Sequence, residues 1–365
     1  MSEPIGTPRP WRTRVIQLVG FLIGIALLAY VVRLALNEDN REGLRQLGEA
    51  SPASIAALLA VTAIGLTASG VQFWLVLRPI RRLNPLDVLS TNYIAILLSY
   101  LPFKLSVMFR LAIHKGRDGI PLAIIGPWFG AIGIVLLIPT LPIVILADVR
   151  PVLDAIGLAT VAGMTVLLTA ATATLATRFG QGRGLARARA LADRQPIGII
   201  KRLVRSETFE RFDESLGMLA SFRHGLLLMS IRVIDIAAFA GRFYIVSRML
   251  GEPMDFGACV IASAVYFFIG VFSPIGSLGA REAGTAGAFA LFNSIGLDLS
   301  SGIDHEQVAV ISVVVTGAEL LVSLTTAALG IAWLRPDRLL RAPKNKTQPT
   351  THAETATPKP TESAP

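Results

Sequence analysis

Apolar runs dominate the chain, and several are long enough to cross a lipid bilayer. A helix needs about 20 apolar residues to cross the hydrocarbon core. Runs of about that length or longer cover about residues 15–36, 53–77, 120–147, 152–177, 225–250 and 305–334. A transmembrane β-barrel would instead show segments of about ten residues with alternating polarity. The pattern therefore predicts an all-α polytopic membrane protein.

Two further apolar regions, about 86–113 and 256–296, are each interrupted near the middle. The first contains SYLPFKLSVMFR, and the second contains FSPIGSLGAREAG. Proline and glycine free backbone groups from the helical ladder, and hydrocarbon cannot hydrogen-bond them. Each half is also short for a full crossing. We therefore expect each region to be a re-entrant helical hairpin whose tip faces protein, water or a polar ligand, although two full crossings apiece would also fit.

The charges between the runs predict which loops lie in the cytoplasm. Basic residues dominate the N-terminal tail, 78–85, 103–118, 178–223 and the C-terminal tail. Because basic loops stay on the cytoplasmic side, these segments and both termini are expected inside. The remaining loops are acidic on balance and are expected outside; they are 37–52, 148–154, 251–255 and 297–306.

This assignment predicts an internal symmetry. Region 86–113 starts and ends inside, and region 256–296 starts and ends outside, so each enters and returns. The order is then span, span, hairpin, span, twice over. Each unit crosses the membrane three times, which is an odd number. The second unit, about 152–334, is therefore inverted relative to the first unit, about 15–147. Interrupted apolar segments at corresponding positions of two halves indicate the central site of a transporter.

Two tails are expected to flank the membrane domain of residues 15–334, and one long cytoplasmic loop is expected within it. Residues 1–14 form a cytoplasmic tail, and residues 335–365, rich in Thr, Pro, Lys and Glu, form a disordered one. The basic loop 178–223 contains TFERFDESLGMLASF, which has an apolar helical face. It predicts either an amphipathic helix on the inner leaflet or a linker helix packed on the bundle.

Composition agrees with this class and excludes others. Hydrophobic residues make up 53% of the chain and charged residues only 16%, and the mean hydropathy is +0.60. The formal net charge of +9 is typical of basic cytoplasmic loops, so we expect no nucleic-acid partner. The single cysteine, Cys259, predicts a small buried side chain. No histidines have metal-ligand spacing, and no ATP- or dinucleotide-binding motif is present, so we expect neither metal nor cofactor.

Ionisable residues at the broken tip are the first candidates for function. Arg281 offers a planar fork suited to phosphate. Glu282 could balance Arg281, or contact a cationic headgroup or a proton, and a self-contained pair that stiffens the hairpin is the alternative. Arg110 follows Pro102 by eight residues, as Glu282 follows Pro274. Arg110 is expected either to bind a phosphate near the inner boundary or to snorkel to the surface.

A polar stripe on the 225–250 span supplies further candidates. Arg232 and Asp235 are three residues apart and can pair on one helix face, and Arg242 follows on the same face. The side chains of such residues should face the interior of the helix bundle rather than the lipid. Glu319, near the middle of the last span, is expected to meet one of these arginines or to be neutral in an apolar setting.

The stretch SPIGSLGAREAG resembles the lysylphosphatidylglycerol synthase transmembrane-region family of flippase-like membrane proteins. Members carry a P-x-G-x-L-G-x-R-E-like stretch, matched here by Pro274, Gly276, Leu278, Gly279, Arg281 and Glu282. Members also carry a P-G-x-x-G-E-x-x-R-like stretch in the first half, of which Pro102 and Arg110 remain. Phe103, Ser106 and Val107 stand where Gly, Gly and Glu are usual. The resemblance covers roughly residues 15–335.

The resemblance implies a protein that moves lipids, or helps to move them, between leaflets of a prokaryotic cytoplasmic membrane. Some relatives carry a soluble aminoacyl-lipid synthase domain, and none follows Trp333 in this sequence. We therefore expect a translocase for an anionic or polyprenyl-phosphate-linked lipid rather than an enzyme. There are two alternatives. The protein is either a membrane-embedded transferase acting on a lipid-linked substrate or a non-catalytic partner of a cytosolic lipid-modifying enzyme.

Overall fold

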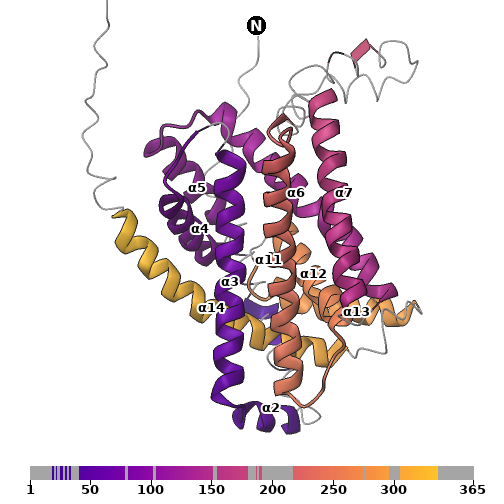
Figure 1. The fold of residues 1–365 in the computed structure, drawn as a ribbon. Helices are drawn as coiled ribbons and strands as arrows, with labels where there is room; N and C mark the ends of the chain where they lie inside the picture. The colour runs from indigo at the N-terminus through magenta and orange to yellow at the C-terminus, as the bar shows by residue number, and fades with distance from the viewer. Residues whose placement is uncertain are drawn as a thin grey trace, which may run out of the picture. The chain divides into compact units, whose positions relative to one another are not determined.

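The computed structural model describes residues 41–78, 81–101, 104–150, 154–179, 217–273, 277–295 and 305–335, with isolated positions within 19–33 and 186–190. The regular elements in these ranges are helices, which confirms the predicted all-α class (Figure 1). The predicted tails, most of span 15–36 and most of loop 178–223, including residues 208–216 of its amphipathic stretch, lie outside the described residues.

The long helices coincide with the predicted spans. Four are long and apolar enough to cross a membrane; they are α3 (Pro52–Leu77), α6 (Leu122–Val149), α7 (Ala155–Phe179) and α14 (His305–Leu334). Helix α11 (Phe222–Met249) is equally long but carries the charged stripe. Helices of this length and composition are those of a multi-pass membrane protein. A short helix, α2 (Arg41–Gly48), precedes α3.

Both interrupted regions form pairs of short helices, as predicted. The first pair is α4 (Pro85–Ser99) and α5 (Leu105–Gly116); the second is α12 (Phe256–Phe272) and α13 (Ala280–Ser294). At 1.5 Å rise per residue none of them reaches about 30 Å, the thickness of the hydrocarbon core. Each second helix follows a residue with positive φ, 50° at Lys104 and 75° at Gly279. Gly279 lacks a Cβ and adopts this conformation without strain.

Local signals fix where the helices begin. Ser51 accepts a hydrogen bond from the Ser54 amide at 3.1 Å, and Pro52 opens α3. Asp154 accepts from the Gly157 amide at 2.7 Å at the start of α7 and pairs with Arg150. The hydrogen bond from Arg150 lowers the pKa of the Asp154 carboxyl to about 2. The cap is therefore a carboxylate at neutral pH, the form that favours a helix N-terminus.

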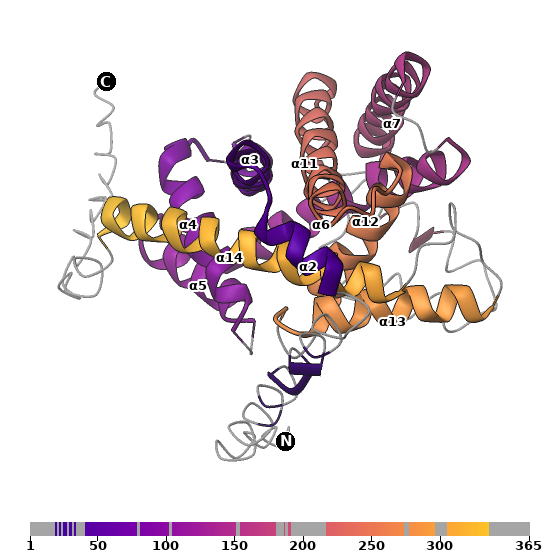
Figure 2. The same cartoon turned by 90° about the horizontal axis from the view of Figure 1, so that it is seen from below.

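The helix pairs pack crosswise around a central pair. Helices α3 and α11 pack along each other, with α7 on the far side of α11 (Figures 1 and 2). Helix α4 packs against α14, α12 packs against α6, and α13 lies along α14. Figures 1 and 2 together show α14 running at a large tilt to α3 and α11. Each predicted hairpin thus contacts the last long helix of the other half of the chain.

The contact between α4 and α14 depends on a glycine. A Cβ on Gly330 would lie 2.9 Å from the Ser90 carbonyl oxygen, whereas a Cβ on Gly317, in the same helix, would meet nothing within 4 Å. Close approach of backbones at small residues is typical of helix packing in membranes. The α4–α14 contact is therefore sensitive to a single added methyl group.

We expect Gly330→Ala to lower the free energy of unfolding, because overpacking costs about 1–3 kcal/mol. Gly317→Ala is the matched control and should be neutral or slightly stabilising, since alanine is the better helix former. Thermal unfolding of the purified protein in detergent measures both. Equal stability of the two variants would contradict the close contact.

Candidate functional site

A cavity of about 360 Å³ lies among the two hairpins and the long helices α3, α6, α11 and α14. It brings together four predicted site residues that are far apart in sequence; they are Arg110, Asp235, Arg281 and Glu319. Other polar residues also line it: Ser69, Gln72, Ser99, Lys104, Ser106, Ser273 and Ser277. Because it lies among membrane-spanning helices, this cavity offers a polar interior at the depth of the bilayer.

Glu319 is the centre of the charged cluster. One carboxylate oxygen accepts from Arg242 Nη1 at 2.9 Å and the other from Arg281 Nη1 at 3.1 Å. Both arginines and Glu319 are largely withdrawn from solvent, with side-chain exposures of 0%, 13% and 3% respectively. Two guanidinium groups thus share one carboxylate, which leaves an excess of positive charge beside the cavity.

Aromatic rings surround Arg281 on two sides. Its guanidinium carbon lies 5.6 Å from the ring centre of Tyr100 and 5.1 Å from that of Tyr266. The negative face of an aromatic ring attracts a cation at such distances. The rings and Glu319 together hold the guanidinium group at the cavity wall.

Two glycines make room for the arginines, and the sequence analysis did not identify them. A Cβ on Gly65 would lie 2.5 Å from Arg242 Nη2, and a Cβ on Gly270 would lie 2.2 Å from Arg281 Nε. Both glycines line the cavity. A glycine inside an apolar helix is the only signal in the sequence, and that signal does not say which side chain the glycine faces.

Arg232 and Asp235 form the predicted pair. Arg232 Nη1 donates to Asp235 Oδ2 at 2.5 Å, and Gln72 donates to the same oxygen at 3.3 Å. Arg232 also reaches Thr140 on α6 at 3.0 Å. The other oxygen, Asp235 Oδ1, is buried with no hydrogen-bond partner among the described residues. Asp235 lines the cavity, whereas Arg232 and Arg242 do not and instead act through their carboxylate partners.

Arg110 differs from the other buried arginines because its partner is neutral. Its Nη2 donates to Asn92 Oδ1 at 2.6 Å, and its guanidinium carbon lies 4.3 Å from the Phe73 ring centre. Within the described ranges it makes no ion pair, and it is only 9% exposed. Arg110, the nearby Lys104 and the two arginines that share Glu319 give the cavity an excess of positive charge. The cavity therefore attracts anions.

The tips of the two helix pairs meet beside the cavity. The Ser99 carbonyl at the end of α4 accepts from the Ser277 amide at 3.2 Å and from the Ser277 hydroxyl at 3.0 Å. Pro274 and Gly276, the other predicted tip residues, lie outside the described residues. Gly279 lies just before α13, and its positive φ turns the chain into that helix.

Glu282 lies behind the cavity wall. It is fully buried and accepts a hydrogen bond from Thr316 on α14. Arg281 pairs with Glu319 instead of with its neighbour Glu282. The alternative of a self-contained Arg281–Glu282 pair is therefore not what the structure shows.

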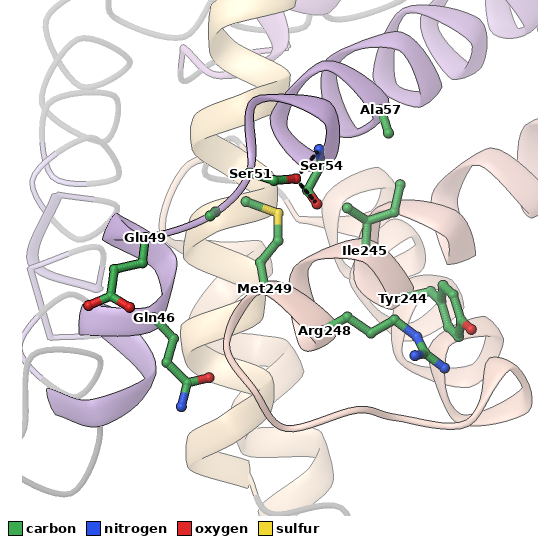
Figure 3. Close-up of a pocket in the computed structure, with 10 residues that line it drawn as sticks. Gln46, Glu49, Ser51, Ser54, Ala57, Tyr244, Ile245, Arg248 and Met249 are labelled. Atoms are coloured by element: carbon green, nitrogen blue, oxygen red, sulfur yellow. Dashed lines mark hydrogen bonds between the residues drawn. The ribbon is translucent and has the colours of Figure 1, made fainter.

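A larger cavity, of about 450 Å³, lies where α2 and the start of α3 meet the end of α11 (Figure 3). Gln46, Glu49, Ser51, Ser54, Tyr244 and Arg248 contribute its polar lining. Glu49 is exposed and pairs with Arg45 at 3.7 Å. None of the predicted site residues lines this cavity. The smaller central cavity holds the buried charges, and we treat it as the candidate site.

The amino-acid sequence was compared with models of known protein families. The model of the lysylphosphatidylglycerol synthase TM region matches residues 17–330. The chain belongs to this family. No curated protein and no solved structure matches it. Membership in the lysylphosphatidylglycerol synthase TM region family agrees with the apolar helices and indicates a multi-pass membrane protein with a lipid-related function.

We expect Glu319→Gln to destabilise the protein strongly. The change leaves two buried guanidinium groups without an anion, and breaking a buried pair costs about 3–5 kcal/mol. Glu49→Gln is the control, because an exposed pair contributes at most about 1 kcal/mol. Chemical unfolding in detergent compares the two variants. A small effect of Glu319→Gln would contradict the central role of this carboxylate.

Proposed function

We propose that this protein is a lipid translocase that moves an anionic, phosphate-containing lipid, of the phospholipid or polyprenyl-phosphate kind, between leaflets. The main support is the arginine-lined cavity among apolar helices. In it the carboxylates are too few to balance the cations, so an anionic group would complete the charge balance. We place the protein in the cytoplasmic membrane of a prokaryote, with both termini in the cytoplasm.

The main energetic barrier to lipid transfer is the passage of the charged headgroup through the hydrocarbon core. Bringing an ionised group into hydrocarbon without partners costs many kcal/mol, so a polar route inside the protein is required. Guanidinium groups bind phosphate through two parallel hydrogen bonds. Arg110 on α5 and Arg281 on α13 both line the cavity, so a phosphate held there would contact both helix pairs. The acyl or prenyl chains would stay in the bilayer.

The crosswise packing supports alternating access. If residues 15–147 and 152–334 are inverted repeats, α3 corresponds to α11, α4–α5 to α12–α13, and α6 to α14. The contacts of α4 with α14 and of α12 with α6 are then equivalent. In carriers with inverted repeats, the two halves rock around a fixed central site. The Ser99–Ser277 contact between the tips would separate and re-form during this motion.

A membrane-embedded transferase is the second candidate. The unpartnered Asp235 Oδ1 belongs to a residue that lines the cavity. A buried carboxylate oxygen with no partner is available as a general base toward a lipid-linked hydroxyl. A third role, as non-catalytic partner of a cytosolic lipid-modifying enzyme through loop 178–223, concerns residues mostly outside those described.

Reconstitution into liposomes separates these functions. The purified protein is incorporated with fluorescent phosphatidylglycerol or a radiolabelled polyprenyl phosphate, and exchange between leaflets and covalent change are both followed. Exchange without chemical change is the expected result. A new lipid product on chromatography would favour the transferase, and activity only after addition of a cytosolic enzyme would favour the partner role.

We expect Arg110→Gln and Arg281→Gln each to slow exchange of the anionic lipid roughly ten- to hundredfold, the value of one lost charge-assisted hydrogen bond. Arg78→Gln is the control, since Arg78 is exposed and lies over Trp74 outside the cavity. Its rate should equal that of the unmodified protein. Undiminished exchange in both cavity variants would rule out the proposed site.

A further inference from the structure

A buried carboxyl group beside the cavity forms no ion pair with any residue that the structure describes. Glu282 on α13 is 0% exposed. Within the part of the chain that the structure describes, it forms no ion pair, and its Oε2 atom has no hydrogen-bond partner. This differs from Glu319 and Asp235, which both pair with arginines. An ionised Glu282 would be a buried charge without an ion-pair partner, supported only by the first turn of α13 and by the nearby Arg281, which is already paired with Glu319.

Two hydrogen bonds and a contact between an arginine and an aromatic ring connect this carboxyl group to the cavity wall. Thr316 on α14 donates to Glu282 Oε1, and the Tyr266 hydroxyl on α12 lies 2.7 Å from the Thr316 hydroxyl. The Tyr266 ring in turn lies 5.1 Å from the guanidinium carbon of Arg281. Since Thr316 donates its only proton to Glu282, Tyr266 must donate to Thr316. Glu282 is thus linked through two side chains to the arginine that lines the cavity.

The arginines nearest to Glu282 pair with another carboxylate. Arg281, on the same helix, is engaged by Glu319 on α14, and Arg242 on α11 binds the other oxygen of that carboxylate. Of the titratable groups on α12, Tyr266 belongs to this network, and it is neutral at physiological pH. Burying an unpaired carboxylate is far costlier than burying the neutral acid. A proton on Glu282 is the simplest way to remove this cost.

We propose that Glu282 is a proton-binding site that couples lipid movement to the transmembrane proton gradient. This inference rests on the proposed translocase function. With the proton bound, Glu282 is neutral and the positive charge of the cavity is available to an anionic headgroup. When the O–H bond of Glu282 breaks and the proton passes to water, the new carboxylate repels the anionic headgroup and attracts Arg281. Proton and anionic lipid therefore bind together and move in the same direction.

The protonation state is tested first, without any lipid transport. Infrared difference spectra of the protein in liposomes are recorded across neutral pH for the unmodified chain and for Glu282→Gln. We expect a carbonyl band of a protonated carboxylic acid that disappears in the variant and persists in Arg78→Gln. If the unmodified protein shows no band that Glu282→Gln removes, the proton site is overturned.

The coupling is tested by imposing a pH gradient across the same liposomes with fluorescent phosphatidylglycerol. We expect lipid in the unmodified protein to accumulate in the leaflet on the alkaline side. In Glu282→Gln the leaflet distribution should be the same with and without the gradient. Glu282→Asp keeps an ionisable carboxyl group and should keep the response, with a shifted pH midpoint, which controls for misfolding.

The outcomes of these tests are distinguishable. Lipid exchange in the unmodified protein that ignores the gradient overturns the coupling but leaves the translocase function intact. If neither the unmodified protein nor any variant exchanges lipid, the translocase function is overturned and the coupling with it. The infrared result then still decides whether Glu282 binds a proton. A gradient response that survives Glu282→Gln also overturns the assignment.

Discussion

The arrangement of this protein depends on one carboxylate that two buried arginines share. Glu319 binds Arg242 on α11 and Arg281 on α13 at the same time, so it joins the last helix to both the central pair and the second broken pair. Leaving both of these arginines without an anion at this depth would be costly. The helices that carry them must therefore meet at Glu319, and this requirement fixes the position of the cavity beside it.

Small residues make that meeting possible. Long arginine side chains reach Glu319 because Gly65 and Gly270 leave space where any larger residue would collide. Gly330 similarly lets α14 approach the backbone of α4. In a membrane, helix association depends on close packing rather than on exclusion of water. The glycines therefore hold the helices together and also determine the shape of the polar interior.

The cavity combines unequal charges in a way that suits a transported anion. Arg110 has a neutral partner, and Arg242 and Arg281 share one acid, whereas Arg232 is balanced by Asp235. A site that is fully balanced would have little attraction for a headgroup, and a site with no acids would be too costly to form. The residual positive charge lies between two broken helix pairs whose tips touch at Ser99 and Ser277, where a relative movement of the two pairs would change access to it.

The sequence by itself determined the helices and the identity of the charged residues. The hydropathy pattern predicted the long helices to within a few residues, because hydrocarbon imposes strict lengths on a spanning chain. The breakers Pro102 and those around Gly279 predicted both interrupted pairs, because hydrocarbon cannot hydrogen-bond the backbone groups that they free. The sequence also predicted the Arg232–Asp235 pair, which is local to one helix. Only the tertiary structure decided that Glu319 joins Arg242 to Arg281, that Arg110 pairs with Asn92, that Gly65 and Gly270 accommodate arginines, and that Glu282 stands apart from its neighbour. Those contacts join residues of different helices, and their partners follow from how the helices pack rather than from any spacing along the chain.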